Sequence, residues 1–417
     1  MPEDLKKIYR TIMEDRFPSR LEIRFVSELL KMQVMIYEKV SWVIEGVNTG
    51  LRYGENPGQE AALYKLMNGN LMLGQVNTIQ PGRFLASEVE LLQSGKHPGK
   101  TNITDADNAL NILRYLTDRP TCVIVKHNNP CGVARSDSLA DAYVKADLAD
   151  RVAAFGGCIA LNRAVDKTTA EEIVKRYAEV VVAPEFEQGV LDIFAKKKNL
   201  RVMRIQNMAR LEQWANQIFV DFKSLIDGGL ILQTSFVPVT RTPKDLKLAE
   251  CEYKGKVYKI KRQPTAKEYE DLLFGWLVEA GVTSNSVLYV KDQVTVGIGT
   301  GEQDRVGVAE IARDKAYRKL ADRYCFLETG KPFNELTNPA QKKHYQDRAA
   351  KEHGGIQGAA MVSDAFFPFR DGIDVGLNEG VTAVIQPGGS DRDFESIEAC
   401  NEKNATMVYT GQRSFKH

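Results

Sequence analysis

Residues 124–134 read Ile-Val-Lys-His-Asn-Asn-Pro-Cys-Gly-Val-Ala and give the clearest fold signal in the chain. The apolar run 123–125 is typical of a buried strand, which we expect to deliver Lys126 and His127 to its end. Residues 128–132 are rich in turn formers and predict a loop. A cation beside an imidazole suits proton transfer next to developing negative charge. On spacing alone, a solvated strand edge is the simpler explanation.

Composition restricts the class of protein. The chain has 417 residues, 43% of them hydrophobic and 27% charged, which is ordinary for a globular protein. Lysine and arginine total 56 against 55 aspartate and glutamate, so the formal net charge is +1. This balance provides no global basic field for nucleic acid, although a local basic pocket for a small phosphate is allowed. The length predicts two or three packed units.

Cysteine and histidine spacing argues against a zinc site. The cysteines are scattered without a C-x-x-C pair, and the histidines lack H-E-x-x-H or H-x₃₋₅-H spacing. Reduced cytoplasmic thiols are the expected state. The start of the chain lacks the basic and apolar regions of a signal peptide, and no apolar run approaches the roughly 18 residues of a membrane span. We therefore expect a cytoplasmic protein without a membrane partner.

Strand-like and helix-like segments alternate along most of the chain. Residues 1–48 are charged and helical in pattern, which predicts an N-terminal helical arm. Alternation over 49–205 and again over 263–417 favours an α/β architecture in two halves. Residues 206–262 form a mixed connecting section. The similar order of elements in the two halves suggests a duplication, without a convincing residue-level repeat.

Other segments combine recognition groups with turn formers. Residues 52–57 join an arginine and a tyrosine to a turn, which suits phosphate or an ordinary surface turn. The glycine loop 297–303 can aim backbone N–H groups at an anion or serve close packing. Residues 363–371 hold three phenylalanines that line either a core or a pocket for a flat ring. The loop 386–390 and the tail 410–417 follow strands directly.

Several of these motifs occur in an order that resembles one family. They are Leu-Arg-Tyr-Gly-Glu-Asn-Pro at 51–57, Lys-His at 126–127 with Asn-Pro-Cys-Gly at 129–132, Ala-Phe-Gly-Gly at 154–157, Ser-Asp-Ala-Phe-Phe-Pro-Phe at 363–369, Gln-Pro-Gly-Gly-Ser at 386–390 and the end of the chain from 413 to 417. Over about 49–417 the chain resembles the AICAR transformylase part of the bifunctional purine-biosynthesis protein.

The resemblance implies a fold and an activity. The fold is two cytidine-deaminase-like α/β subdomains, with active sites at a homodimer interface and no zinc. The activity is transfer of a formyl group from 10-formyltetrahydrofolate, the co-substrate, to the 5-amino group of AICAR. A potassium ion is bound by some members. The bifunctional form also carries an IMP cyclohydrolase domain, for which residues 1–48 are too short, so ring closure would need a separate protein.

The resemblance also assigns site residues by position. The catalytic group comprises Lys126, His127 and Asn285. The substrate-binding group, for the phosphate and the imidazole carboxamide, comprises Arg52, Tyr53, Asn102, Arg305, Phe366, Arg413 and His417. The folate-binding group comprises Phe155, Gly156, Glu179, Pro368, Phe369, Asp371 and Ser390.

The implied chemistry is reasonable for these side chains. The amine of AICAR is a poor nucleophile and must lose a proton as it attacks the formyl carbon. A neutral His127 can accept or relay that proton, and Lys126 can stabilise the oxyanion. Two rivals stay open: a catalytically silent sensor or scaffold for an AICAR-like nucleotide, and an enzyme that formylates AICAR from formate and ATP. No phosphate-loop signature supports the latter.

Overall fold

The computed structural model describes residues 11–28, 31–77 and 82–417, and its chain forms two compact units. The first comprises residues up to 117 together with 156–237, and the second comprises 118–155 together with 238–417. The predicted boundaries at 205/206 and 262/263 do not coincide with these units. The segment 118–155, which carries Lys126 and His127, belongs to the same unit as the C-terminal half.

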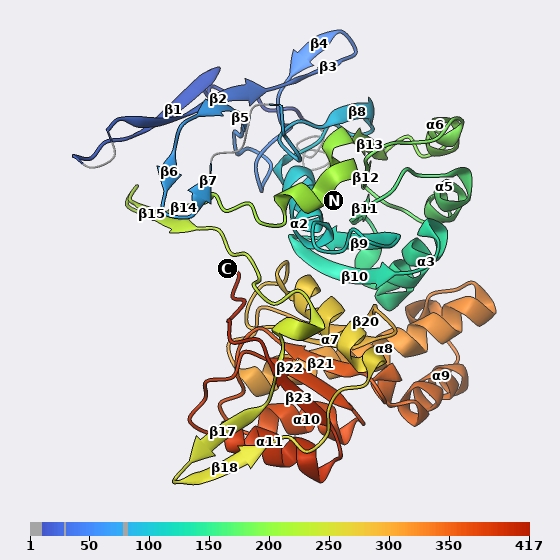
Figure 1. Ribbon diagram of the computed structural model, residues 1–417. Helices are drawn as coiled ribbons and strands as arrows, with labels where there is room; N and C mark the ends of the chain where they lie inside the picture. Colours follow the sequence, from blue (N-terminus) through green and yellow to red (C-terminus); the bar gives the residue numbers. More distant parts are fainter. Residues whose placement is uncertain (1–10, 29–30, 78–81) are drawn as a thin grey trace. The chain divides into compact units, whose positions relative to one another are not determined.

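The first unit is built on a small mixed sheet with the order β11–β12–β13–β8, in which β11, β12 and β13 are parallel and β8 is antiparallel to β13 (Figure 1). Its strands are β8 (Glu90–Gln93), β11 (Cys158–Leu161), β12 (Val180–Ala183) and β13 (Arg201–Arg204). Its helices are α2 (Lys100–Leu113), α5 (Lys167–Val174), α6 (Val190–Phe194) and the 3-10 helix η1 (Gln206–Trp214). Helix α2 packs on β11 and β12.

The first unit also carries antiparallel strands, which correct the predicted helical arm. They are β1 (Arg20–Phe25), β2 (Gln33–Val40), β3 (Trp42–Ile44), β4 (Val47–Thr49), β5 (Leu63–Gly69), β6 (Met72–Leu73), β7 (Val76–Asn77), β14 (Val220–Ser224) and β15 (Leu230–Thr234). In β1, Leu21, Ile23 and Phe25 alternate with charged residues, which is the period of a strand and not of a helix. The helical prediction for 1–48 is therefore wrong for the residues of this range that the structure describes. Residues 1–10 and 29–30 are not among them.

The second unit contains a longer mixed sheet with the order β16–β23–β22–β21–β19–β20–β10–β9 (Figure 1). Its strands are β9 (Thr121–Lys126), β10 (Asn129–Arg135), β16 (Lys247–Leu248), β19 (Val287–Lys291), β20 (Val294–Gly299), β21 (Ala360–Ser363), β22 (Ala383–Gln386) and β23 (Thr406–Tyr409), with a separate hairpin of β17 (Glu250–Tyr253) and β18 (Lys256–Lys259). Strands β21, β22 and β23 are parallel, whereas β9, β10, β20 and β19 form antiparallel neighbours.

Helices flank this sheet. They are α3 (Leu139–Ala149), α4 (Arg151–Ala154), α7 (Ala266–Glu279), α8 (Arg305–Thr329), α9 (Pro339–Lys351), α10 (Asp371–Asn378) and α11 (Asp393–Glu402), with the 3-10 turns η2 (Pro243–Asp245), η3 (Phe333–Glu335) and η4 (His353–Gly355). Helix α3 packs on β10 and α8 on β20. A Cβ on Gly132 would lie 1.9 Å from the Ala146 carbonyl oxygen, and one on Gly297 would lie 2.3 Å from that of Ala312. Glycine at both sites therefore allows a helix to approach its strand closely.

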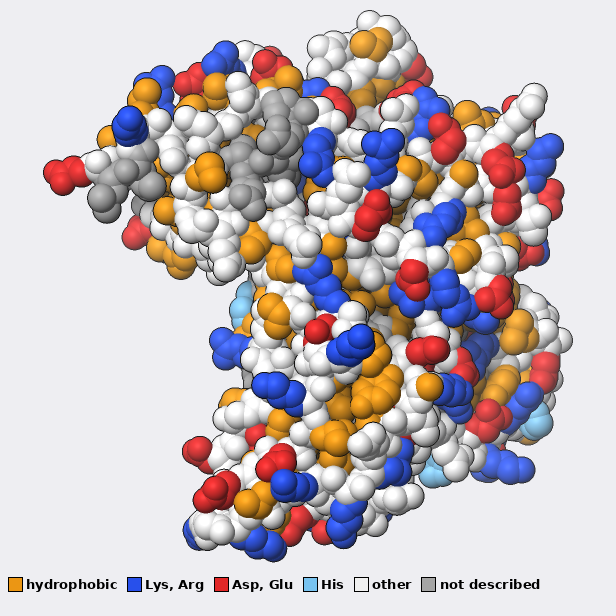
Figure 2. All heavy atoms as spheres, in the orientation of Figure 1, with side chains coloured by type: hydrophobic (Ala, Val, Ile, Leu, Met, Phe, Trp, Pro, Cys, Tyr) orange, Lys and Arg blue, Asp and Glu red, His pale blue; other side chains and the backbone are white. Residues whose placement is uncertain are grey.

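These observations confirm a mixed α/β protein. Counting α-helices and strands, the order helix, strand, strand, helix, helix, strand, helix, strand occurs twice along the chain, beginning at α2 and again at α7. On the face shown in Figure 2, basic and acidic side chains are interspersed, in keeping with a net charge of +1. Among the residues that the structure describes, no helix combines the length and apolar character that crossing a bilayer requires.

Candidate active site

The Lys126–His127 pair occupies a tight hairpin and not the start of a loop. Strand β9 pairs with β10 so that Lys126 faces Asn129, which leaves His127 and Asn128 as the whole connection. Their φ angles are +54° and +62°, the left-handed conformation that a two-residue type I′ hairpin requires. The predicted loop at 128–132 is therefore wrong. Pro130 is accommodated because the ladder has a bulge between it and Gly132.

Contacts from distant segments hold this hairpin. The Asn129 side-chain oxygen accepts hydrogen bonds from the Thr283 N–H at 2.9 Å and the Thr300 hydroxyl at 3.2 Å. The Lys416 ammonium donates to the Asn128 carbonyl at 3.1 Å. The Lys126 ammonium donates to the Phe155 carbonyl at 2.8 Å. The hairpin is thereby fixed against the segment before β19 and against the C-terminal tail.

Asn285 lies on that same segment before β19 and is oriented at both ends of its amide. Its oxygen accepts from the Arg305 guanidinium at 3.0 Å, and its nitrogen donates to the Gln303 carbonyl at 2.9 Å. Arg305 opens α8 and forms a buried ion pair with Asp364, with side-chain exposures of 7% and 0%. The same guanidinium donates to the Ser363 hydroxyl at 3.0 Å. Arg305 therefore positions Asn285 through a rigid, charge-assisted network.

Glu279, at the end of α7, is a buried carboxyl that the sequence analysis did not single out. It is fully buried and accepts a hydrogen bond from the Ser286 hydroxyl at 2.6 Å. Burial, reinforced by the nearby Asp364, raises the pKa of Glu279 well above its ordinary value. The sequence does contain one signal for Glu279, because it is an acidic residue inside an otherwise apolar helical run.

The tail returns to this network. The Ser414 N–H donates to the Asp364 carbonyl at 2.9 Å, and the Ser284 N–H donates to the Lys416 carbonyl at 2.9 Å. Arg413 stacks over the Phe415 ring at 4.2 Å, and that ring meets His417 edge-on at 5.5 Å. The predicted substrate residues Arg413 and His417 thus both contact Phe415.

The predicted folate residues of the second unit are mostly exposed. Phe155 and Phe369 expose 59% and 51% of their surface, and Phe366, which was assigned to the substrate and not to the folate, exposes 39%; these fractions are unusually large for phenylalanine. Arg392 lies over the Phe369 ring at 5.1 Å. Pro368 and Asp371 are also exposed, and Ser390 is half-buried. No hydrogen bond among the described residues links Asp371 or Ser390 to Asn285.

The first unit gathers the remaining predicted residues around the start of α2. The Arg52 guanidinium donates to the Tyr53 hydroxyl at 2.9 Å and lies over its ring. Asn102 accepts from the Gly99 N–H at 3.0 Å and donates to the Glu179 carboxylate at 3.3 Å. Backbone N–H groups at a helix start, next to an arginine, form a suitable anion site.

Gly156, also assigned to folate, lies in the first unit beside the Tyr177 ring. Its φ of +76° is one that side chains other than glycine rarely adopt. A Cβ there would approach a carbon of that ring to 3.3 Å. The backbone conformation therefore accounts for glycine at this position without any ligand.

Arg201 and His97 complete the first-unit cluster and were missed by sequence reasoning. Arg201 is 1% exposed and contacts Glu179 at 3.4 Å. Burial lowers the pKa of Arg201 to about 10, with Glu179 opposing and Arg52 assisting the shift. Burial, with Arg52 and Arg201 adding to it, also lowers the pKa of His97. The sequence signal that could have identified Arg201 is an arginine at the start of the buried strand Arg201–Arg204.

Buried donors remain unpaired in this cluster. The Nε–H groups of Arg52 and Arg201 make no hydrogen bond within the described part of the chain. The Nδ1 atom of His97 is also unpaired there, but it is an acceptor, because Nε2 of the same ring donates to the Gly50 carbonyl. Buried polar groups in native structures are usually paired. Together with the mutual lowering of pKa values, these donors indicate a site of positive potential.

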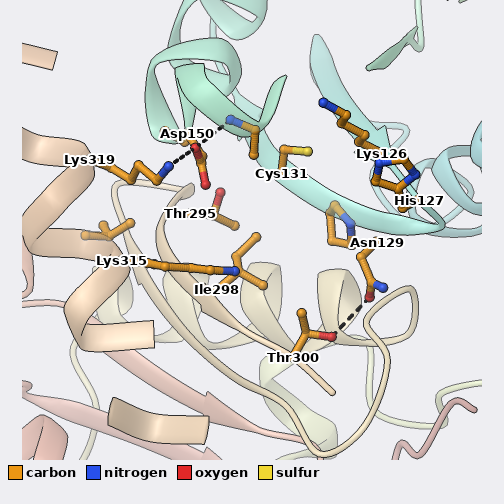
Figure 3. Close-up of a pocket in the computed structure, with 15 residues that line it drawn as sticks. Lys126, His127, Asn129, Cys131, Asp150, Thr295, Ile298, Thr300, Lys315 and Lys319 are labelled. Atoms are coloured by element: carbon orange, nitrogen blue, oxygen red, sulfur yellow. Dashed lines mark hydrogen bonds and ion pairs between the residues drawn. The ribbon is translucent and has the colours of Figure 1, made fainter. Parts of the chain in front are cut away.

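A cavity of about 150 Å³ lies beside the hairpin in the second unit (Figure 3). Its walls come from β9, β10, β20, the end of α3 and the middle of α8, with Lys126 and His127 among the lining residues. Within the described ranges, no group of three or more histidine, cysteine or acidic residues is placed to hold a metal ion.

The fold and this network define a mixed α/β protein that presents a lysine–histidine pair beside an oriented amide and a buried ion pair. The model of the AICARFT/IMPCHase bienzyme family matches residues 24–315. The chain belongs to that family.

Curated relatives agree with this assignment. The chain is similar to the bifunctional purine biosynthesis protein PurH of Caldicellulosiruptor saccharolyticus, with 36% identity over 367 residues, and to that of Magnetococcus marinus, with 40% over 370 residues. Each alignment covers 88% of this chain and 59% of the relative. The protein of the same name from Acetivibrio thermocellus is 35% identical over 99% of this chain and 64% of its own. The chain therefore spans about three fifths of the length of these relatives.

Proposed function

We propose that this protein transfers a formyl group from 10-formyltetrahydrofolate to the 5-amino group of AICAR, as a step in purine biosynthesis. The observation that carries the proposal is the Lys126–His127 hairpin, tied through Asn129 to the segment that presents Asn285. Family membership supports it, because the family description names AICARFT. The products are formyl-AICAR and tetrahydrofolate.

In the proposed reaction, the AICAR amine attacks the formyl carbon and a new C–N bond forms. His127 takes the proton that the amine loses, and Lys126 stabilises the oxyanion that develops on the formyl oxygen. The bond from that carbon to the folate nitrogen then breaks, and the nitrogen leaves with a proton. Asn285 orients the formyl group, because Arg305 and Gln303 fix its amide.

The proposal assigns the substrate-binding residues to three sets. We assign the ribotide phosphate to Arg52, Tyr53 and Arg413, and the first-unit cluster supports this with unpaired buried donors. The residues that we assign to the imidazole carboxamide of AICAR are Asn102, Arg305, Phe366 and His417. The residues that we assign to the folate are Phe155, Gly156, Glu179, Pro368, Phe369, Asp371 and Ser390. Exposed phenylalanines among these suit a flat ring.

The proposal includes an assembly and a fold assignment. We propose a homodimer with active sites at its interface, and two cytidine-deaminase-like subdomains as the basis of the repeated order of elements. Ring closure to IMP is assigned to a cyclohydrolase activity outside residues 49–417.

The deciding experiment mixes purified protein with AICAR and 10-formyltetrahydrofolate and follows tetrahydrofolate by absorbance. Turnover should require both substrates. His127→Ala should lower kcat by about 10²–10⁴-fold, the usual contribution of a general base, while calorimetry still shows AICAR binding. His344→Ala, an exposed histidine on α9, is the matched control and should leave kcat unchanged. Unchanged turnover in His127→Ala would exclude the assigned role.

Two further outcomes would favour the rivals. AICAR binding without turnover under any donor would indicate a nucleotide sensor. Turnover with formate and ATP, but not with the formyl-folate, would indicate the other class of formylating enzyme.

A further inference from the structure

The cavity beside the hairpin has a second set of polar groups that no assignment above uses. Lys315 and Lys319 reach it from α8, and Asp150 reaches it from the start of α4. Figure 3 shows the Lys315 ammonium pointing into the cavity, on the opposite side from Lys126 and His127. The volume of about 150 Å³ greatly exceeds the roughly 10–15 Å³ that one water needs. A compact polar ligand therefore fits.

The charges that line the cavity do not balance. Lys319 pairs with Asp150 at 2.7 Å, and their side chains are only 18% and 11% exposed. Asp150 also caps α4 by accepting from the Ala153 N–H at 2.9 Å. Within the described residues, neither Lys126 nor Lys315 makes an ion pair with a carboxylate. Lys315 therefore faces the cavity without an anionic partner. The Lys126 side chain also lines the cavity, and its ammonium donates to the Phe155 carbonyl.

Of Lys126 and Lys315, the second has the less expected position for a lysine. It is half-buried on α8 and makes no hydrogen bond within the described residues. Burial lowers its pKa, with Asp150 opposing the shift and Lys319 reinforcing it. A lysine on a helix ordinarily extends its ammonium to solvent, since burying an unpaired charge is costly. The nearby Asn129 side-chain nitrogen also has no partner within the described ranges and can donate a hydrogen bond.

We propose that this cavity binds a compact oxyanion, of the phosphate or carboxylate type, between Lys315 and Lys126. The oxyanion accepts charge-assisted hydrogen bonds from the two ammonium groups, whereas the Lys319–Asp150 pair closes the wall beside it. The site is separate from the Arg52 cluster of the first unit. It does not rest on the transferase proposal, because it predicts binding without turnover.

The test is calorimetric titration of the full chain with inorganic phosphate and, in a parallel arm, with glutarate. Lys315→Met should weaken binding of the preferred anion by at least about tenfold, since it removes a charge-assisted hydrogen bond. Lys315→Arg should restore most of the affinity. Lys351→Met, which removes an exposed lysine from α9 of the same unit, should bind like the unaltered protein.

Binding at the first-unit cluster is separated by repeating the titration in Arg52→Leu. A Lys315-dependent event that persists there supports the proposal, even in a preparation without transferase activity. Tighter phosphate binding would identify a phosphorylated ligand, and tighter glutarate binding a carboxylate arm. Loss of all anion binding in Arg52→Leu, or equal binding by Lys315→Met and the unaltered protein, would overturn the proposal.

Discussion

Two hairpin turns in the second unit have the same backbone and different surroundings. The His127 turn joins β9 to β10, and the Gln293 turn, Asp292–Gln293, joins β19 to β20. Both residues of each turn have positive φ, between +54° and +62°. In the Gln293 turn, the two N–H groups donate to the Asp271 carboxylate at 3.1 and 2.7 Å. His127 and Asn128 are instead exposed.

The difference separates a turn that supports the fold from one that presents side chains. Asp271 is 3% exposed and Gln293 is 9% exposed, so the Gln293 turn is held by a buried carboxylate, although its other residue, Asp292, is exposed. The His127 turn is anchored mainly by the residues on either side of it, which leaves the imidazole accessible. Equivalent positions in a repeated pattern can therefore serve stability in one copy and, under the proposed function, chemistry in the other.

The largest stability effect is expected from removing the support of the Gln293 turn. Asp271→Ala leaves the buried Gln293 N–H and the part-buried Asp292 N–H without an acceptor. An unsatisfied buried donor costs about 1–3 kcal/mol, so we expect a loss of about 2–4 kcal/mol in the free energy of unfolding. The urea midpoint measures it. Asp347→Ala, on the exposed face of α9, should change the midpoint little. Equal midpoints for both variants would contradict the supporting role of Asp271.

A smaller, pH-dependent effect is expected at the start of α7, the helix that carries Asp271. Burial opposes ionisation of Glu268, but hydrogen bonds from Arg262 and the Thr265 N–H outweigh it and lower its pKa from 4.5 to about 2. A lowered acid pKa stabilises the folded state above pH 4.5, and this stability is lost as pH falls toward 2.

Arg262→Met should therefore destabilise the protein by about 1 kcal/mol at pH 7, after allowance for solvent screening. The difference from the unaltered protein should shrink between pH 4.5 and 2. Chemical denaturation at several pH values measures it, with Lys261→Met, an exposed neighbour, as control. A difference that stays constant across this range would refute the linkage.

The smallest effect concerns the backbone of the two turns. His127→Gly removes the strain of a positive φ and should stabilise the fold by about 0.5–1 kcal/mol while removing the proposed base. Asp292→Gly should bring a similar backbone gain, partly offset by loss of its exposed ion pair with Lys267, and should leave turnover intact. Thermal unfolding and the transferase assay distinguish the two. Turnover lost equally in both variants would remove the distinction between the turns.

Much of the fold followed from local pattern. The strand expected at 123–125 is part of Thr121–Lys126, and the alternation expected over 263–417 includes the helix Ala266–Glu279, where Thr265 and Glu268 form a capping box. The segment after His127 was misassigned because proline and asparagine signal loops, whereas here a bulge accommodates the proline. The charged start of the chain was misassigned because charge was given more weight than the two-residue period of β1.

The site was only partly accessible from sequence. Lys126 and His127 could be named in advance because they lie in a recognisable motif, and Asn285 only by its position in the family resemblance; the roles of all three stay predictions. Arg201, Glu279 and Lys315 could not, since an isolated charged residue in a strand or helix ordinarily faces solvent. Their burial depends on neighbours that are distant along the chain, such as Asp364 for Glu279.

The sequence by itself determined the α/β class, most element positions, the balanced charge and the family, because each depends on local periodicity or on motifs read in order. Tertiary structure alone decided that residues 118–155 pack with the C-terminal half, that Arg305 and Asp364 form a buried pair, and that Lys315 faces a cavity. Burial, ion pairing and pKa shifts arise from contacts between distant segments, and local pattern does not specify those contacts.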